Sequence, residues 1–159
     1  MVPVKLADDT ITVFNARVDP EAGGNVWIPT VITGVSWYLT DAATVDASKG
    51  GLVAANKATI RIPVDADAGG KAYADPVSYA SAEDVSGLWT LKGGDIVVKG
   101  EVTGGDWSPA RLKAAYAECV TVLAVTDNTR NRARTAGASA SRTAHGMAPR
   151  AAHWRVTAT

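Results

Sequence analysis

The sequence predicts an all-β protein, either a small antiparallel β-barrel or a β-sandwich, with one short α-helix and a long loop rich in arginine and alanine. Three observations favour this class. Short segments alternate apolar and polar residues with a period of two, glycine is frequent at 15 residues, and five tryptophans against one phenylalanine suit sheets and turns better than a helical bundle. At 159 residues the chain fits one domain, residues 1–159.

The first half of the chain contains three segments that we interpret as strands, residues 11–16, 31–40 and 58–64. The last of these alternates until Pro63, which removes a hydrogen-bond donor from the sheet, so this strand is predicted to end near Pro63 or to lie at an edge where another subunit can add. The second segment places four large side chains on one predicted buried face: Val31, Val35, Trp37 and Leu39.

The second half begins with the clearest hairpin pattern. Residues 88–91 and 96–102 flank the turn-forming Lys92-Gly93-Gly94-Asp95, which predicts two antiparallel strands. One helix of about ten residues is then predicted, because Ser108 can cap it and Pro109 suits its first position. Its apolar residues recur at helical spacing: Leu112, Ala115, Tyr116 and Cys119.

The C-terminal third combines two predicted strands with an unusual connection. Residues 120–125 are almost entirely apolar, which predicts a central strand covered on both faces and ended by Asp127-Asn128. Residues 153–156 predict a closing strand. Residues 129–152 between them are rich in Ala, Arg, Ser, Thr and Gly and cannot form a core, so we expect an extended basic loop or arm.

Charge is divided between two parts of the chain. Residues 1–127 carry ten Lys and Arg and all sixteen acidic residues (10 − 16 = −6), while residues 128–159 carry six Arg and no acid (+6). The formal net charge of zero is therefore a cancellation. The basic segment could lie on an acidic face of a neighbouring subunit, follow a phosphate backbone, or remain a solvated loop. Its candidate contact residues are Arg130, Arg132, Arg134, Arg142 and Arg150.

Trp27 and Trp107 are the remaining candidate contact residues. Both lie next to turn residues rather than in a clean alternation. Either could be an exposed interface residue, and core or local packing is the alternative.

Motifs for nucleotide and metal binding are incomplete. Gly70-Lys71 lacks both the earlier glycine and the following Ser or Thr of a phosphate-binding loop. The run 65–70 resembles a calcium loop, but its fifth position is Gly and its twelfth is Pro76, which favours a solvated turn. We therefore predict no metal and no cofactor.

Catalytic residues are equally sparse. The two histidines are His145, in the basic segment, and His153, beside Trp154, and neither is accompanied by a pattern of acid–base partners. Cys119 lies between the predicted helix and an apolar strand, where a buried and inert thiol is expected. The sequence predicts that this protein is not an enzyme.

The N-terminus offers no targeting pattern. Residues 1–5 lack a basic flank followed by an apolar stretch, and no apolar run approaches the roughly 20 residues that cross a bilayer. We expect a protein made and kept in a cytoplasm, with no membrane partner.

Four segments, residues 32–37, 58–63, 89–100 and 153–156, together resemble a family of small structural proteins from tailed bacteriophages. They occur in the same order and span most of residues 10–128 plus the last strand. The segment 131–152 is longer than the corresponding part of the family pattern. No catalytic residue is carried over by the resemblance.

The resemblance implies a virion protein of the head-and-neck type, assembled in the host cytoplasm. The favoured role is a homo-oligomeric head–tail connector ring, such as the head-closure or stopper protein beneath the portal. The implied partners are identical subunits, portal or adaptor proteins and tail proteins, with packaged DNA as a further candidate. A tail-terminator or capsid-decoration protein is an alternative, as is a solitary β-sandwich binding module that stacks sugars on Trp27 or Trp107.

Overall fold

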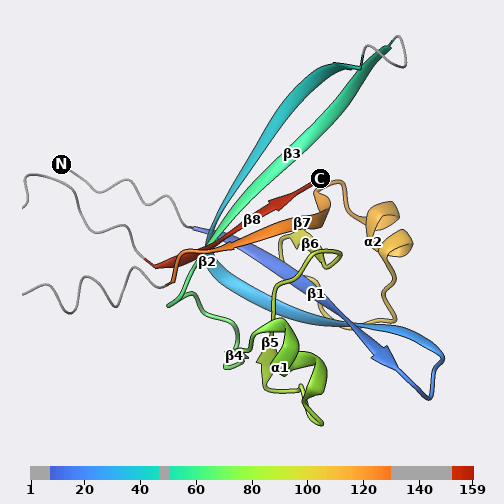
Figure 1. The fold of residues 1–159 in the computed structure, drawn as a ribbon, viewed down its shortest axis with the longest axis vertical. Coiled ribbons are helices and arrows are strands. Elements are labelled where there is room, and N and C mark those ends of the chain that lie inside the picture. Colours follow the sequence, from blue (N-terminus) through green and yellow to red (C-terminus); the bar gives the residue numbers. More distant parts are fainter. Residues whose placement is uncertain (1–7, 47–50, 130–151) are drawn as a thin grey trace, which may run out of the picture.

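The computed structural model describes residues 8–46, 51–129 and 152–159. Six strands form a closed antiparallel barrel (Figure 1). Closure confirms the all-β prediction and selects the barrel over the sandwich. In barrel order the strands are β1 (Asp9–Asp19), β2 (Gly24–Asp46), β3 (Gly51–Pro63), β8 (His153–Ala158), β7 (Cys119–Asp127) and β6 (Ile96–Lys99).

Two helices and a two-stranded sheet complete the fold. The helix α2 (Pro109–Ala115) follows β6, and Ser108 caps it by accepting a hydrogen bond from the Arg111 N–H at 3.3 Å, as predicted. A second helix, α1 (Pro76–Ser81), was not predicted. It lies between β4 (Ala72–Tyr73) and β5 (Leu88–Trp89), which pair in parallel. Asp75 caps α1 by accepting from two backbone N–H groups.

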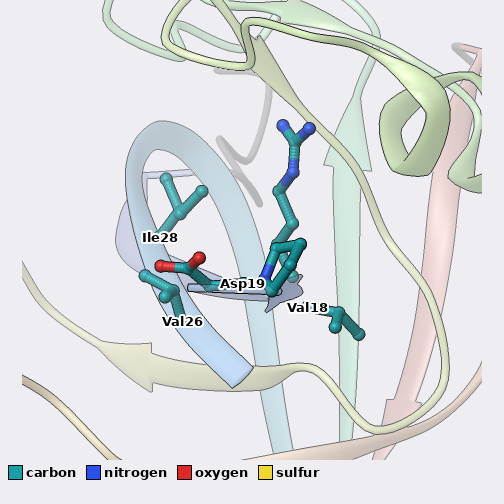
Figure 2. A pocket seen from close by; sticks show the side chains of 6 residues that line it. Val18, Asp19, Val26 and Ile28 are labelled. Carbon is teal, nitrogen blue, oxygen red and sulfur yellow. The ribbon is translucent and has the colours of Figure 1, made fainter. Parts of the chain in front are cut away.

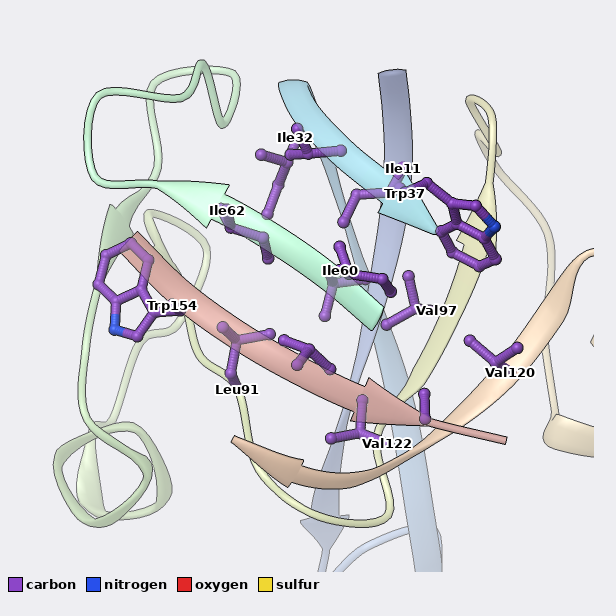
Figure 3. Close-up of a cluster of buried hydrophobic side chains, with 14 of the residues drawn as sticks. Ile11, Ile32, Trp37, Ile60, Ile62, Leu91, Val97, Val120, Val122 and Trp154 are labelled. Carbon is purple, nitrogen blue, oxygen red and sulfur yellow. The ribbon is translucent and has the colours of Figure 1, made fainter. Parts of the chain in front are cut away.

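The main core fills the barrel interior with side chains that alternate along the strands (Figure 3). Ile11, Ile60 and Val156 are fully buried there, and Trp37 is 9% exposed, which confirms it as a core residue. The ring centroids of Tyr73 and Trp154 lie 4.3 Å apart, where β4 meets the barrel.

The predicted buried face of β2 is partly wrong. Gly34 adopts a φ of 85°, and the register with β1 shifts there, so that Asp9 pairs with Val35 and Thr10 with Thr33. Ile32 and Val35 consequently both point into the core, whereas Val31 is only half-buried. Leu39 is 47% exposed. A bulge reverses the alternation, which a period of two cannot reveal.

A second apolar cluster covers the outer surface of β1 and β6. Phe14, Ile96 and Val98 point outward from these strands and pack beneath Leu112 of α2. We call this surface the covered wall. The helix is seven residues long rather than about ten, and Ala115 is exposed, so only part of its predicted apolar face is buried.

The predicted hairpin over residues 88–102 is wrong. β5 pairs with β4, while β6 pairs with β1 and β7. The turn at Gly94 does form, with a φ of 92°. It does not join two paired strands, because the buried Asp95 ties the turn to β1 instead.

One further strand prediction needs correction. β7 is not covered on both faces, since Leu123 is 57% exposed and the register with β8 shifts beside it. β3 ends at Pro63, which confirms the first of the two predicted alternatives. Its part Ala58–Pro63 does not lie at an edge, because β8 pairs with it on the side away from β2. The closing strand β8 is confirmed. No helix in the described ranges is long and apolar enough to cross a membrane.

Candidate functional site

A two-stranded ribbon leaves the barrel at one end (Figure 1). β3 pairs with β8 only from Ala58 to Pro63, whereas it pairs with β2 as far as Gly51. The pairs from Thr40↔Lys57 to Asp46↔Gly51 therefore extend beyond the barrel wall. We call these seven pairs the β2–β3 arm. At about 3.3 Å for each residue, the arm is roughly 23 Å long.

Both outer edges of the β2–β3 arm are open within the part of the chain that the structure describes. Along such an edge, backbone N–H and C=O groups have no strand partner, which makes it a template for pairing with another chain. Within the barrel itself, each strand pairs with a neighbour on both sides, so the closed sheet has no free edge. The arm is therefore the element best suited to reach a neighbouring molecule.

The β1–β2 hairpin also reaches past the barrel, and it carries an open groove of about 320 Å³ (Figure 2). Its lining includes Val18 and Val26, which are 72% and 41% exposed. Asp19 stabilises the hairpin turn by accepting from the Glu21 N–H at 2.9 Å. The groove is open to solvent, and its lining combines apolar side chains with Arg17 and Asp19.

The strongest polar cluster is buried and centred on Asp95, which is fully inaccessible to solvent. Asp95 Oδ1 accepts hydrogen bonds from Lys92 Nζ at 2.5 Å and from the Ala16 N–H at 3.2 Å. Its Oδ2 accepts from Asn15 Nδ2 at 2.9 Å and from the Lys92 N–H at 3.1 Å. Both oxygens are thus fully engaged by groups of β1 and of the turn itself.

Asn15 extends this network to Thr90, the residue that follows β5. Its Nδ2 donates to the Thr90 carbonyl at 2.7 Å, and its Oδ1 accepts from the Thr90 N–H at 3.2 Å. Both Asp95 oxygens and both ends of the Asn15 amide have internal partners, so these hydrogen bonds hold the turn against β1.

The residues tested for chemistry occupy structural positions. Cys119 packs partly buried against the covered wall, and burial raises the pKa of its thiol, with the charge of Lys113 opposing this in part. A raised pKa keeps the thiol protonated at neutral pH, where it is a poor nucleophile. His153 Nε2 lies 3.4 Å from Asn128 Nδ2.

The glycine-rich run 65–70 forms a turn, as favoured from the sequence. Asp67 pairs with Thr33 through two backbone hydrogen bonds, and its Oδ1 accepts from the Gly69 N–H at 2.9 Å. Lys71 Nζ donates to the Pro29 carbonyl and to Thr30 Oγ1. Burial lowers the pKa of Lys71. Across the described ranges, no group of three or more His, Cys, Asp or Glu residues could hold a metal ion.

The structure places Trp27 and Trp107 in the second apolar cluster. Both are partly buried there, and the Trp107 ring lies 5.8 Å from that of Tyr116. Trp107 Nε1 donates to the Gly104 carbonyl. Their observed contacts are local packing.

The predicted arginine contacts lie outside the described residues. These are Arg130, Arg132, Arg134, Arg142 and Arg150, together with His145. The described chain leaves β7 and enters β8 at one end of the barrel, because the Asn128 N–H donates to the His153 carbonyl at 3.0 Å.

Sequence reasoning missed the β2–β3 arm. The relevant pattern is two short runs, Thr44-Val45 and Leu52-Val53, on either side of the turn-forming residues 46–51. Alanine occupies four of the neighbouring positions, and this residue is uncommon in strands, so the two runs do not stand out.

The chain belongs to a family of unknown function, DUF6751, whose family model matches residues 6–159. No curated protein matches the chain, and no solved structure matches it.

Proposed function

We propose that this DUF6751 member is a structural subunit of a tailed-phage virion, which assembles with identical copies into a head–tail connector ring such as the head-closure or stopper protein. The observation that carries the proposal is the β2–β3 arm, which extends from a closed barrel with both edges open. The proposal includes no catalysis. The protein would act by fitting its surfaces to those of its neighbours.

The arm supports assembly because an exposed two-stranded ribbon is hard to explain in a solitary protein. Isolated hairpins are marginally stable in water, and unpaired strand edges promote association. An arm that pairs with, or lies against, a neighbouring subunit gains both stability and partners for its backbone groups. In a ring with head-to-tail contacts, the arm of each copy would contact the next copy, and the same contact would repeat around the ring.

The phage assignment is supported by the resemblance of residues 32–37, 58–63, 89–100 and 153–156 to tailed-phage structural proteins. The charge division adds a second contact in this proposal. The basic segment with Arg130, Arg132 and Arg134 would lie on an acidic surface of the next copy, or on the portal-side ring. Packaged DNA is the competing partner for these arginines.

Assembly can be tested by mass photometry of the wild-type chain and of a variant in which an Asn-Gly turn replaces residues 41–56. That turn suits a two-residue hairpin joining Thr40 to Lys57. We expect the wild type to form a discrete oligomer and the shortened variant to remain a folded monomer. An oligomer that survives removal of the arm would contradict the role given to it.

The virion role is tested separately by mass spectrometry of purified phage particles. A structural subunit is expected at a fixed copy number per particle, and absence from infectious particles would refute the phage assignment. Reversing the charge of Arg130, Arg132 and Arg134 separates the two arginine partners. Loss of rings indicates a protein contact, whereas intact rings with poor DNA retention indicate a lumenal contact with DNA.

A further inference from the structure

Among the described side chains, cations and hydroxyl groups predominate on the outer surface of four neighbouring strands, one of which, β7, ends at the exposed Asp127. On β3 the outward residues include Lys57 and Arg61, and on β8 they include Arg155. All three of these side chains are exposed. The same surface continues with hydroxyl-bearing neighbours in register on β2, β3, β8 and β7: Tyr38, Thr40, Thr59, Thr157 and Thr126. We call this surface the basic wall.

Arg61 and Arg155 are directly opposite each other on adjacent strands. Side chains at such positions have Cβ atoms about 4.5–5.5 Å apart, and like charges there destabilise the sheet. In the described ranges, neither guanidinium takes part in a hydrogen bond or an ion pair. Two forked cations with unused donors are suited to carboxylates, which each guanidinium can bind through two hydrogen bonds.

Three exposed carboxylates of the same chain lie at the two ends of the helix α1. Asp75, Glu83 and Asp84 flank α1, and all three are exposed. We call them the acidic flank. Arg17 of β1 fixes its position by donating to the Ala82 carbonyl. Hydrogen bonds from Ser86 lower the pKa of Asp84, so it is charged at neutral pH.

The strand order separates the basic wall from part of the acidic flank. In the ring β1-β2-β3-β8-β7-β6, β1 lies three strands from β8 in either direction. Glu83 and Asp84 follow Ala82, whose carbonyl binds Arg17 of β1, so this part of the acidic flank lies on the β1 side of the barrel. Asp75 lies nearer to β8, because the Tyr73 ring packs against Trp154. In the described ranges neither Arg61 nor Arg155 is paired with Glu83 or Asp84, and a neighbouring copy can supply these carboxylates.

We propose that the basic wall of one copy docks on the acidic flank of the next copy, which makes this pair of surfaces the repeating head-to-tail contact of the assembly. The inference rests on the proposed self-assembly and names the surfaces that perform it. Such a contact joins two different patches, and it closes into a ring when the rotation between copies permits. Opposed charges also set the orientation of docking and make it weaken as salt rises.

Charge reversal on each surface provides the test. We expect Arg61→Glu/Arg155→Glu to weaken self-association on the order of 100-fold, because the contact then joins two acidic patches. Glu83→Lys/Asp84→Lys should weaken it similarly by joining two basic patches. An equimolar mixture of the two variants should assemble again, in alternation, since each variant presents a patch complementary to the other.

Two control variants match the change in charge. Arg111→Glu/Lys113→Glu on α2 adds the same four negative charges, and Glu101→Lys/Asp106→Lys adds four positive charges, at exposed positions outside both surfaces. Both controls should assemble like the wild type. Thermal melts of every variant show whether the barrel has folded, so that lost assembly is not confused with lost structure.

The outcomes separate the inference from the function on which it rests. Failure of the wild type to self-associate at any salt concentration would remove the proposed assembly itself. A wild type that assembles, with an Arg61→Glu/Arg155→Glu variant that assembles equally well, would overturn the docking surfaces alone. So would two assembly-defective variants that do not rescue each other. Binding of a labelled DNA duplex can be measured in parallel by fluorescence anisotropy. If the Arg61→Glu/Arg155→Glu variant still assembles but no longer binds DNA that the wild type binds, the basic wall is a nucleic-acid surface.

Discussion

The covered wall and the basic wall belong to one barrel, yet their outward residues differ in kind. On β1 and β6, the outward residues Phe14, Ile96 and Val98 are apolar, and α2 shields them from water. On β3 and β8, the corresponding positions carry arginine and threonine and face solvent. The interior is apolar beneath both walls, so the barrel core does not explain the difference.

The difference shows which surfaces the chain covers by itself and which it leaves to solvent or to a partner. The covered wall needs α2, and its apolar residues would be a liability without that helix. The basic wall folds without any covering element. Substitutions on the two walls should accordingly affect different properties, stability on one side and association on the other.

The largest expected loss of stability comes from removing a buried side chain of the covered wall. Phe14→Ala removes a fully buried ring between β1 and α2, which should lower the free energy of unfolding by about 4 kcal/mol. Urea denaturation at constant m-value measures this loss. Leu123→Ala, on an exposed side chain of β7, serves as the control and should change stability by less than about 0.5 kcal/mol. Equal losses would contradict the burial of Phe14 beneath α2.

The next effect tests the network that fixes β6 beside β1. Asp95→Ala removes one acceptor each from Lys92 Nζ, from Asn15 Nδ2 and from the Ala16 N–H, and should cost about 3 kcal/mol. This value lies at the low end for a broken buried pair because the Lys92 side chain is one-third exposed and Lys92 Nζ still donates to the Ala16 carbonyl. Exchange of the Ala16 amide hydrogen should accelerate at the same time. Unchanged protection there would contradict the hydrogen bond to Asp95 Oδ1.

The all-β class and several of its strands could be anticipated because their signals are local, whereas the choice between barrel and sandwich depends on pairing. Alternating segments predicted β1, the middle of β2, the end of β3 at Pro63 and the closing strand β8. The Ser108–Pro109 pair placed the start of α2 correctly, since capping depends on neighbouring residues alone. These predictions needed no knowledge of which strands meet.

Pairing and assembly surfaces could not be anticipated, since they depend on distant contacts. The hairpin over residues 88–102 failed because Asp95 bonds to Asn15, which lies 80 positions earlier in the chain. Arg61 and Arg155 were unremarkable in sequence, and only the β3–β8 register sets them side by side. Of the residues singled out as contacts, both tryptophans are packed locally, and the five arginines lie outside the described ranges.

A smaller effect is expected at the helix that covers the wall. Ser108→Ala removes the oxygen that accepts from the Arg111 N–H, and should lower the unfolding free energy by about 1 kcal/mol. The matched control is Ser81→Ala, whose hydroxyl only donates to carbonyls of its own helix α1 and should change stability much less. Equal effects in urea denaturation would argue against the cap as the support of α2.

The smallest effect has the opposite sign and belongs to the basic wall. Arg155→Thr removes the like charge opposite Arg61 and should stabilise the monomeric chain by about 0.5 kcal/mol at low salt. The gain should shrink as salt screens the repulsion between the two cations. Urea denaturation at low and high salt measures both quantities.

The register of β3 and β8 decides what happens when both arginines are replaced. Since the repulsion belongs to the pair, Arg61→Thr/Arg155→Thr should gain no more than either single substitution. Lys57→Thr should show no salt-dependent gain, because Lys57 is opposite Thr40. If the gains in unfolding free energy from the two single substitutions add fully, the two guanidinium groups do not repel each other. A non-additive gain in the unfolding free energy of the monomer, together with weaker assembly of the same variant, would support the proposal. It would show that the arginines of the basic wall destabilise the free subunit and stabilise the contact between subunits.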